Sequence, residues 1–170
     1  DLPTNAEMRD QIKAMARRHE GPKRLDQIRE MRIEALRLMR TLARFRPRLI
    51  GSVWTGHVRR GSDIDIHIFS DSQSIVTDTL DELSLTYDVQ HKKVIKHNEE
   101  RFFTHIHIDG RFPFELTLYP EDKVHYVFKS SITGKAIERA SIAELEAALK
   151  AEDPEVDLEF EVERTEDHID

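Results

Sequence analysis

The residues best suited to chemistry gather in one stretch, 49–69, with the sequence LIGSVWTGHVRRGSDIDIHIF. Side chains alternate along a β-strand, so Asp63, Asp65 and His67 share one face and the intervening isoleucines point to the other. Neighbouring carboxylates repel and raise each other's pKa unless a cation lies between them. The pair therefore predicts a site for a hard divalent cation. A solvent-facing edge strand with two incidental acids is the alternative.

A third acid, Glu115, lies in the expected strand 113–118. Glu115 and Thr117 alternate there with Phe and Leu residues, so they share the face opposite to the apolar side chains. Three carboxylates from two neighbouring strands can hold two Mg²⁺ or Mn²⁺ ions about 3.5–4 Å apart. Asp63 and Asp65 would bridge both ions, while Glu115 would bind one and accept the proton of an attacking hydroxyl. The alternative for Glu115 is an exposed hairpin residue.

The spacing of these residues resembles a known family. Gly51-Ser52, Gly56 and Ser62-Asp63-Ile64-Asp65 resemble the GS-x(10)-D-x-D pattern of the nucleotidyltransferase superfamily that includes DNA polymerase β. The resemblance is closest to small bacterial nucleotidyltransferase-domain proteins and covers about residues 48–119. It implies an α/β fold, or α+β in looser usage, in which a small mixed sheet is flanked by helices.

The resemblance also implies roles for individual residues. Asp63, Asp65 and Glu115 would be the catalytic and metal-binding acids. Gly51 would allow close approach of a triphosphate, and Ser52 would donate to its oxygens. Residues 53–55 are Val-Trp-Thr where many relatives carry an arginine, so the nearby arginines become candidate phosphate ligands, with solvated loop residues as the alternative. The candidate nucleotide-binding residues are Gly51, Ser52, Arg59, Arg60 and Ser62.

The activity implied is transfer of a nucleoside monophosphate from ATP or another NTP, with Mg²⁺ or Mn²⁺, to a hydroxyl acceptor, with release of pyrophosphate. The acceptor would be a protein, an RNA end or a small molecule. Pyrophosphate transfer occurs on the same fold. Two other classes stay open: a non-catalytic nucleotide-binding module, and an antitoxin-like interaction protein that contacts its partner through the N-terminal helices or the acidic tail.

Histidines offer a second metal hypothesis. The chain has nine of them, and His105 and His107 share one face of an expected strand. Zinc needs three or four converging ligands, and no HExxH-like spacing is present, so zinc is the minor alternative. If this strand pairs with that of Glu115, one of the two histidines would reach the nucleotide pocket.

Composition limits the classes of protein to consider. With 170 residues and no cysteine, the chain can have neither disulfides nor thiolate metal sites nor a cysteine nucleophile. No apolar run approaches the roughly 18 residues of a membrane span, so we expect a soluble cytoplasmic protein without membrane contact. The net charge of −7 is uneven: residues 152–170 hold ten acids and one arginine, whereas residues 1–48 are basic, which suits phosphates or simply a solvated face.

Three regions are expected along the chain. Residues 1–47 should form an N-terminal helical hairpin, with a capping box at Thr4–Glu7 and a break at Gly21-Pro22. Residues 48–151 should form the nucleotidyltransferase domain, and residues 152–170 an acidic tail. Within the domain we expect strands at 48–53, 62–69, 87–95, 101–108 and 113–118 and helices at 73–84 and 142–150. In the tail, 155–164 fits either an edge strand or a disordered or partner-bound segment.

Overall fold

A computed structural model describes residues 5–130 and 132–160. Its helices and strands follow in the order α1 (Asn5–Thr41), the 3-10 helix η1 (Ala43–Phe45), β1 (Arg48–Ile50), α2 (Gly51–Thr55), β2 (Ile64–Phe69), α3 (Gln73–Glu82), β3 (Thr86–Lys96), β4 (Glu99–Asp109), β5 (Phe114–Tyr119), η2 (Glu121–Lys123) and α4 (Ile142–Glu152). In the part of the chain so described, no helix is long and apolar enough to cross a membrane.

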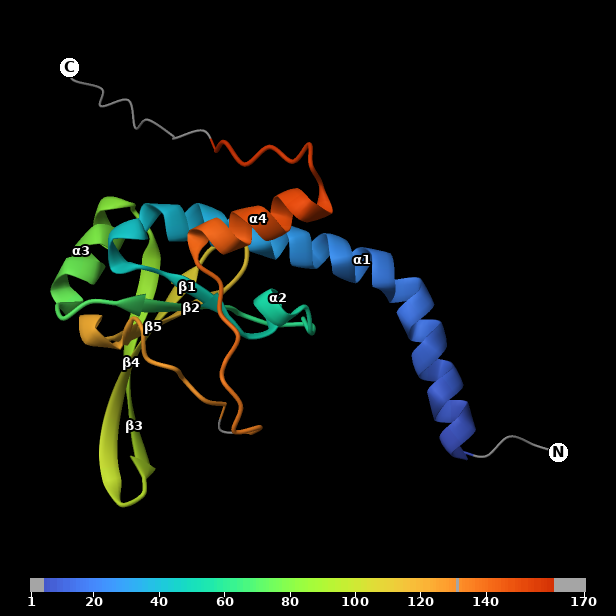
Figure 1. Cartoon of the computed structure of the whole chain (residues 1–170), viewed down its shortest axis with the longest axis horizontal. Coiled ribbons are helices and arrows are strands. Elements are labelled where there is room, and N and C mark those ends of the chain that lie inside the picture. Colours follow the sequence, from blue (N-terminus) through green and yellow to red (C-terminus); the bar gives the residue numbers. More distant parts are fainter. Residues whose placement is uncertain (1–4, 131, 161–170) are drawn as a thin grey trace.

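The strands form one mixed sheet in the order β1-β2-β5-β4-β3 (Figure 1). Strands β2 and β5 are parallel, and the other neighbours are antiparallel. Only residues 104–108 of β4 pair with β5, so the rest of the β3–β4 hairpin extends beyond the sheet as a two-stranded arm. The expected mixed α/β (α+β) class with flanking helices is confirmed.

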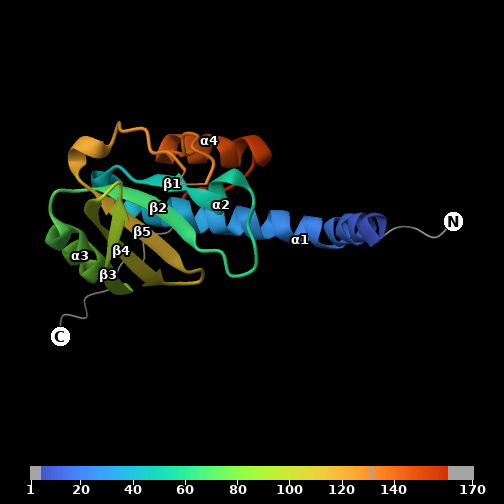
Figure 2. The same ribbon diagram turned by 90° about the horizontal axis from the view of Figure 1, so that it is seen from below.

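The core lies on one face of the sheet, against α1, α3 and α4. Alternation along β2 places Ile64, Ile66 and Ile68 on this face with no exposed surface. In Figure 2 α1 passes behind the strands, and the segment between η2 and α4 passes β1, with which it forms the bridge Leu49–Ala140. The other sheet face carries the polar side chains of β2, β5 and β4.

The expected N-terminal hairpin is wrong, because α1 is one continuous helix of 37 residues. Gly21 and Pro22 lie inside it. An interior proline removes one backbone hydrogen bond and bends a helix without having to end it, and the ribbon changes direction in the N-terminal half of α1 (Figure 1). Thr4, the expected cap, is outside the described residues. The C-terminal half of α1 contributes buried side chains such as Met31 and Met39 to the core.

The other helix and turn predictions are largely confirmed. Ser72 caps α3, and Ser141 and Glu144 form a complete capping box on α4. The turn at Asp109-Gly110 joins β4 to β5. The first strand is shorter than expected, because the backbone turns at Gly51, which has φ of +71°, and continues as α2.

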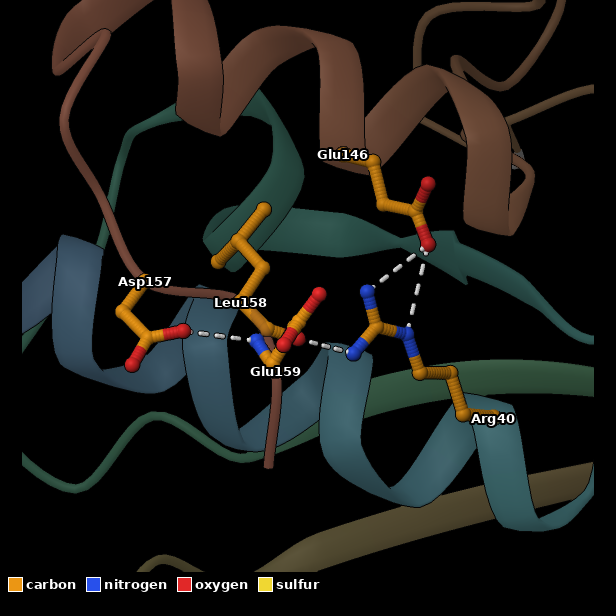
Figure 3. Close-up of polar contacts among 5 residues, drawn as sticks. All are labelled: Arg40, Glu146, Asp157, Leu158 and Glu159. Carbon is orange, nitrogen blue, oxygen red and sulfur yellow. Dashed lines mark hydrogen bonds and ion pairs between the residues drawn. The ribbon is translucent and has the colours of Figure 1, made fainter. Parts of the chain in front are cut away.

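The beginning of the acidic tail packs on the protein and is not a strand. Leu158 is only 6% exposed. The Arg40 guanidinium donates to the Leu158 carbonyl and to Glu146 Oε1, at 3.0 and 3.2 Å for the latter (Figure 3). Phe160 lies under the guanidinium groups of Arg37 and Arg40, at 4.5 and 4.8 Å. Residues 161–170 lie outside the described part.

Candidate functional site

The structure brings the three predicted acids together. Asp65 in β2 is the direct cross-strand partner of Glu115 in the parallel neighbour β5, and Asp63 immediately precedes β2. All three side chains are partly buried. Carboxylate oxygens of Asp63 and Glu115 lie within 4.8 Å of each other and of a ring nitrogen of His107. Two segments about fifty residues apart in sequence therefore form one cluster, which we call the acidic cluster: Asp63, Asp65, Glu115 and His107.

The histidine strand supplies further members of this site. Strand β4 pairs with β5, and His107 is the cross-strand partner of Glu115. Nδ1 of His105 lies 2.8 Å from Glu115 Oε1 and 3.2 Å from Thr117 Oγ1. The strand that carries the two histidines thus pairs with the strand of Glu115, which is the condition under which we expected a histidine to reach the site. The sequence did not single out His107, because its pairing with Glu115 is centred on Arg111 and not on the expected Asp109-Gly110 turn.

Crowding and burial disturb the protonation of this cluster. Burial raises the pKa of Asp65 to about 7, and the charges of Glu115 and Asp63 act in the same direction. Burial lowers the pKa of His105, and Glu115 offsets part of that effect. A neutral His105 then donates an Nδ1–H hydrogen bond to Glu115 rather than forming an ion pair. The cluster thus has excess negative charge without an internal cation to balance it.

Gly51 fits against this cluster for two physical reasons. Its φ of +71° disfavours any residue with a Cβ, and a Cβ there would lie 2.7 Å from Asp65 Oδ2. The backbone at the start of α2 therefore packs directly on Asp65. Ser52 follows in the first turn of α2 and is partly buried.

The other predicted phosphate ligands lie elsewhere in the loop. Ser62 Oγ accepts a hydrogen bond from the Arg59 backbone N–H at 2.8 Å, so this hydroxyl closes a local turn. Arg59 and Arg60 are exposed and line a cavity of about 300 Å³ together with Lys23 and Arg24 of α1. None of the three acids belongs to that lining. The structure therefore groups these arginines with the basic face of α1 instead of with the acidic cluster.

The donor set of the acidic cluster fits a divalent metal ion. Carboxylate oxygens are the ligands that Mg²⁺ and Mn²⁺ prefer. A cation would relieve the repulsion from Glu115 and Asp63, which adds to burial in raising the pKa of Asp65. The imidazole of His107 adds one nitrogen, a ligand that also suits Zn²⁺. Metal titrations of this protein therefore need all three ions.

Comparisons with known proteins add no relative to this picture. A scan against protein-family models and searches of curated proteins and of solved structures gave no match. The function is therefore argued from the site itself.

Proposed function

We propose that the protein is a metal-dependent nucleotidyltransferase that uses Asp63, Asp65 and Glu115. The observation that carries the proposal is the β2–β5 register, which sets Glu115 beside Asp65 on the sheet face opposite the helical core. The GS-x(10)-D-x-D spacing supports it, since Gly51 is both the start of that pattern and the residue packed on Asp65. The resemblance to the DNA polymerase β superfamily is part of this proposal.

The residues of the cluster would divide the work in the following way. Asp63, Asp65 and Glu115, with His107, would hold Mg²⁺ or Mn²⁺, which supplies neutralisation of the charge on the NTP phosphates. The acceptor oxygen attacks the α-phosphorus, the bond to the leaving pyrophosphate breaks, and the hydroxyl proton passes to a carboxylate oxygen of Glu115. His105 orients that carboxylate through its contact with Oε1.

Binding of nucleotide tests the first half of the proposal. Titration of each NTP with Mg²⁺ or Mn²⁺ should show metal-dependent binding that weakens at least 100-fold in Asp63→Ala/Asp65→Ala. The matched control is Asp78→Ala/Glu82→Ala, which removes two exposed acids from α3 and should bind like the wild type. Equal binding by both double variants would exclude the acidic cluster as the metal and nucleotide site.

The position of a label tests the second half. NTP labelled at the α-phosphate should transfer its label to an acceptor in protein, RNA or small-molecule fractions, whereas label at the γ-phosphate should leave with pyrophosphate. Transfer of the γ-label instead would contradict nucleotidyl transfer. Label at the β-phosphate would then distinguish pyrophosphate transfer, which carries the β-phosphate along, from transfer of the terminal phosphate alone. Metal-dependent binding without transfer of either label to any fraction would favour the non-catalytic module over the enzyme.

A further inference from the structure

A small cavity lies further along the sheet face that carries the acids. Its volume is about 200 Å³. Its walls come from β1, β2 and the segment after η2, and they include Ile50, His67, Val127, Phe128, Ile137 and Arg139. We call it the His67 cavity. Ile50 is the cross-strand partner of Asp65, so the cavity begins where the acidic cluster ends.

The His67 ring forms one wall of this cavity. The side chain is only 4% exposed, and among the described residues its Nδ1 atom has no hydrogen-bond partner. The ring is held edge-on by Tyr119 at 4.8 Å and by Phe128 at 5.1 Å between centroids. A buried nitrogen without a partner is unfavourable, and a ring fixed by two aromatic neighbours cannot readily turn to find one. The Nδ1 atom itself is covered, so the cavity is lined by other atoms of the ring.

Positive charge gathers at the same place. Arg48 is the cross-strand partner of His67, and Arg139 lies in the cavity wall. Burial is the largest cause that lowers the pKa of His67 and of Arg48, and the nearby charge of Arg139 lowers both further. The carboxylate of Glu144 offsets part of this effect at Arg48. Arg139 also donates a long hydrogen bond, 3.4 Å, to the Tyr126 carbonyl, which leaves other guanidinium N–H groups for a ligand.

The remaining wall is apolar and partly open to solvent. Val127 is 60% exposed, and Phe128 and Ile137 are partly buried. A volume of about 200 Å³ is below the roughly 300–1,000 Å³ of sites for drug-sized ligands. The occupant is therefore a small molecule or a small group of a larger one.

We propose that the His67 cavity binds a small organic anion, with an aromatic or other apolar body against Phe128 and Val127 and a carboxylate or phosphate held by Arg139. A guanidinium group matches either anion with two parallel hydrogen bonds. The proposal does not rest on metal binding or on nucleotidyl transfer. It concerns a site two residues along β2 from Asp65, about 7 Å at the rise of a strand.

Four small probes test the chemistry of this site. Benzoate and phenyl phosphate carry the aromatic body with each anion, benzamide is the neutral analogue of benzoate, and acetate lacks the body. In two-dimensional NMR titrations with the full chain, at least one of the two aromatic anions should shift resonances of the cavity and bind at least tenfold more tightly than benzamide and acetate. Which anion binds more tightly identifies the head group. Failure of both to bind at 10 mM, or equal binding of benzamide, would overturn the proposal.

Two variants test the residues. Arg139→Gln changes a partly exposed side chain and should weaken binding of the better anion at least tenfold, whereas Arg101→Gln, at an exposed arginine of the β3–β4 arm, should change it less than twofold. Arg139→Gln is the deciding variant, because the charge of Arg139 is the one that holds the anion. Asp65→Asn should leave anion binding unchanged while it impairs metal-dependent NTP binding. Unchanged anion affinity in Arg139→Gln would disprove the site.

Discussion

Asp65 and His67 stand two residues apart on one face of β2, yet the regions around them differ in the sign of their charge. Burial is the largest cause of the pKa shift at both, and it favours the neutral form at both: the pKa of Asp65 rises to about 7 and that of His67 falls to about 4. Around Asp65 the neighbours are the acids Glu115 and Asp63, whereas around His67 they include the cation of Arg139. Each region thus carries an excess of one charge, which Glu144 offsets only in part at Arg48, and each is suited to a ligand of the opposite sign.

The largest effect is expected at the His67 end, in acid. The pKa of His67 is below that of an unfolded histidine, so the unfolded chain takes up the proton first as the pH falls from 6.5 toward 4. Stability from this group is therefore complete above pH 6.5 and lost below it, by about 3 kcal/mol for a shift of this size. In urea unfolding across pH 7 to 4, the wild type should lose this amount relative to His67→Phe.

A control separates burial from the mere presence of a histidine. His125 is exposed. Replacing it with Gln should change the free energy of unfolding, relative to the wild type, by no more than about 0.5 kcal/mol at every pH. If His67→Phe gives an equally flat curve, burial does not hold His67 neutral, and the contrast with Asp65 disappears.

At the acidic end, the contact between Gly51 and Asp65 should matter more for the site than for the fold. Gly51→Ala adds left-handed strain and pushes a Cβ to 2.7 Å from Asp65 Oδ2. We expect a loss of about 2 kcal/mol in the free energy of unfolding, together with weaker metal binding, because the carboxylate must move. Urea unfolding and Mn²⁺ titration measure the two effects.

Gly61 provides the matched comparison. Its φ is +80°, and a Cβ there would meet nothing within 4 Å. Gly61→Ala should therefore cost only the backbone strain, about 1 kcal/mol, and leave metal binding intact. Equal metal binding by the two alanine variants would show that Gly51 does not position Asp65.

Local patterns in the sequence were enough to place the acids on one face but not to show their surroundings. Period-two alternation gave the phase of Asp65 and Glu115, and the Ser141–Glu144 pattern gave the cap of α4. Adjacency of β2 and β5 is a long-range pairing, which no local pattern encodes. The place of His107 in the acidic cluster and the His67 cavity both follow from how distant segments meet.

Two errors have the same origin. Gly21-Pro22 is a helix-breaking pair by local chemistry, yet α1 continues through it, since a proline removes one hydrogen bond while the remaining turns persist. The alternation of 155–164 fits an edge strand and its charge fits a disordered or partner-bound segment, yet Leu158 is buried and Arg40 binds its carbonyl (Figure 3). Apolar side chains such as Leu158 and Phe160, together with the Arg40 guanidinium, outweigh the average charge of the segment.

The smallest effect should appear at Asp65, in the opposite pH window. Its pKa of about 7 lies above that of an unfolded aspartate, so the folded protein holds a proton between pH 4 and 7. Stability from this group is present at low pH and lost as the pH rises through 7. Because the side chain is partly exposed, we expect Asp65→Asn to stabilise the protein by only about 1.5 kcal/mol at pH 8, and by almost nothing at pH 4. Urea unfolding at both pH values measures this change.

Asp78→Asn, at an exposed acid of α3, is the control and should give no such gain at pH 8. Saturating Mg²⁺ should remove the advantage of Asp65→Asn, because a bound cation stabilises only the carboxylate form. If Asp65→Asn destabilises the metal-free protein at pH 8, the acids are already balanced internally. Asp65 and His67 would then not be two oppositely charged halves of one face, each open to a ligand.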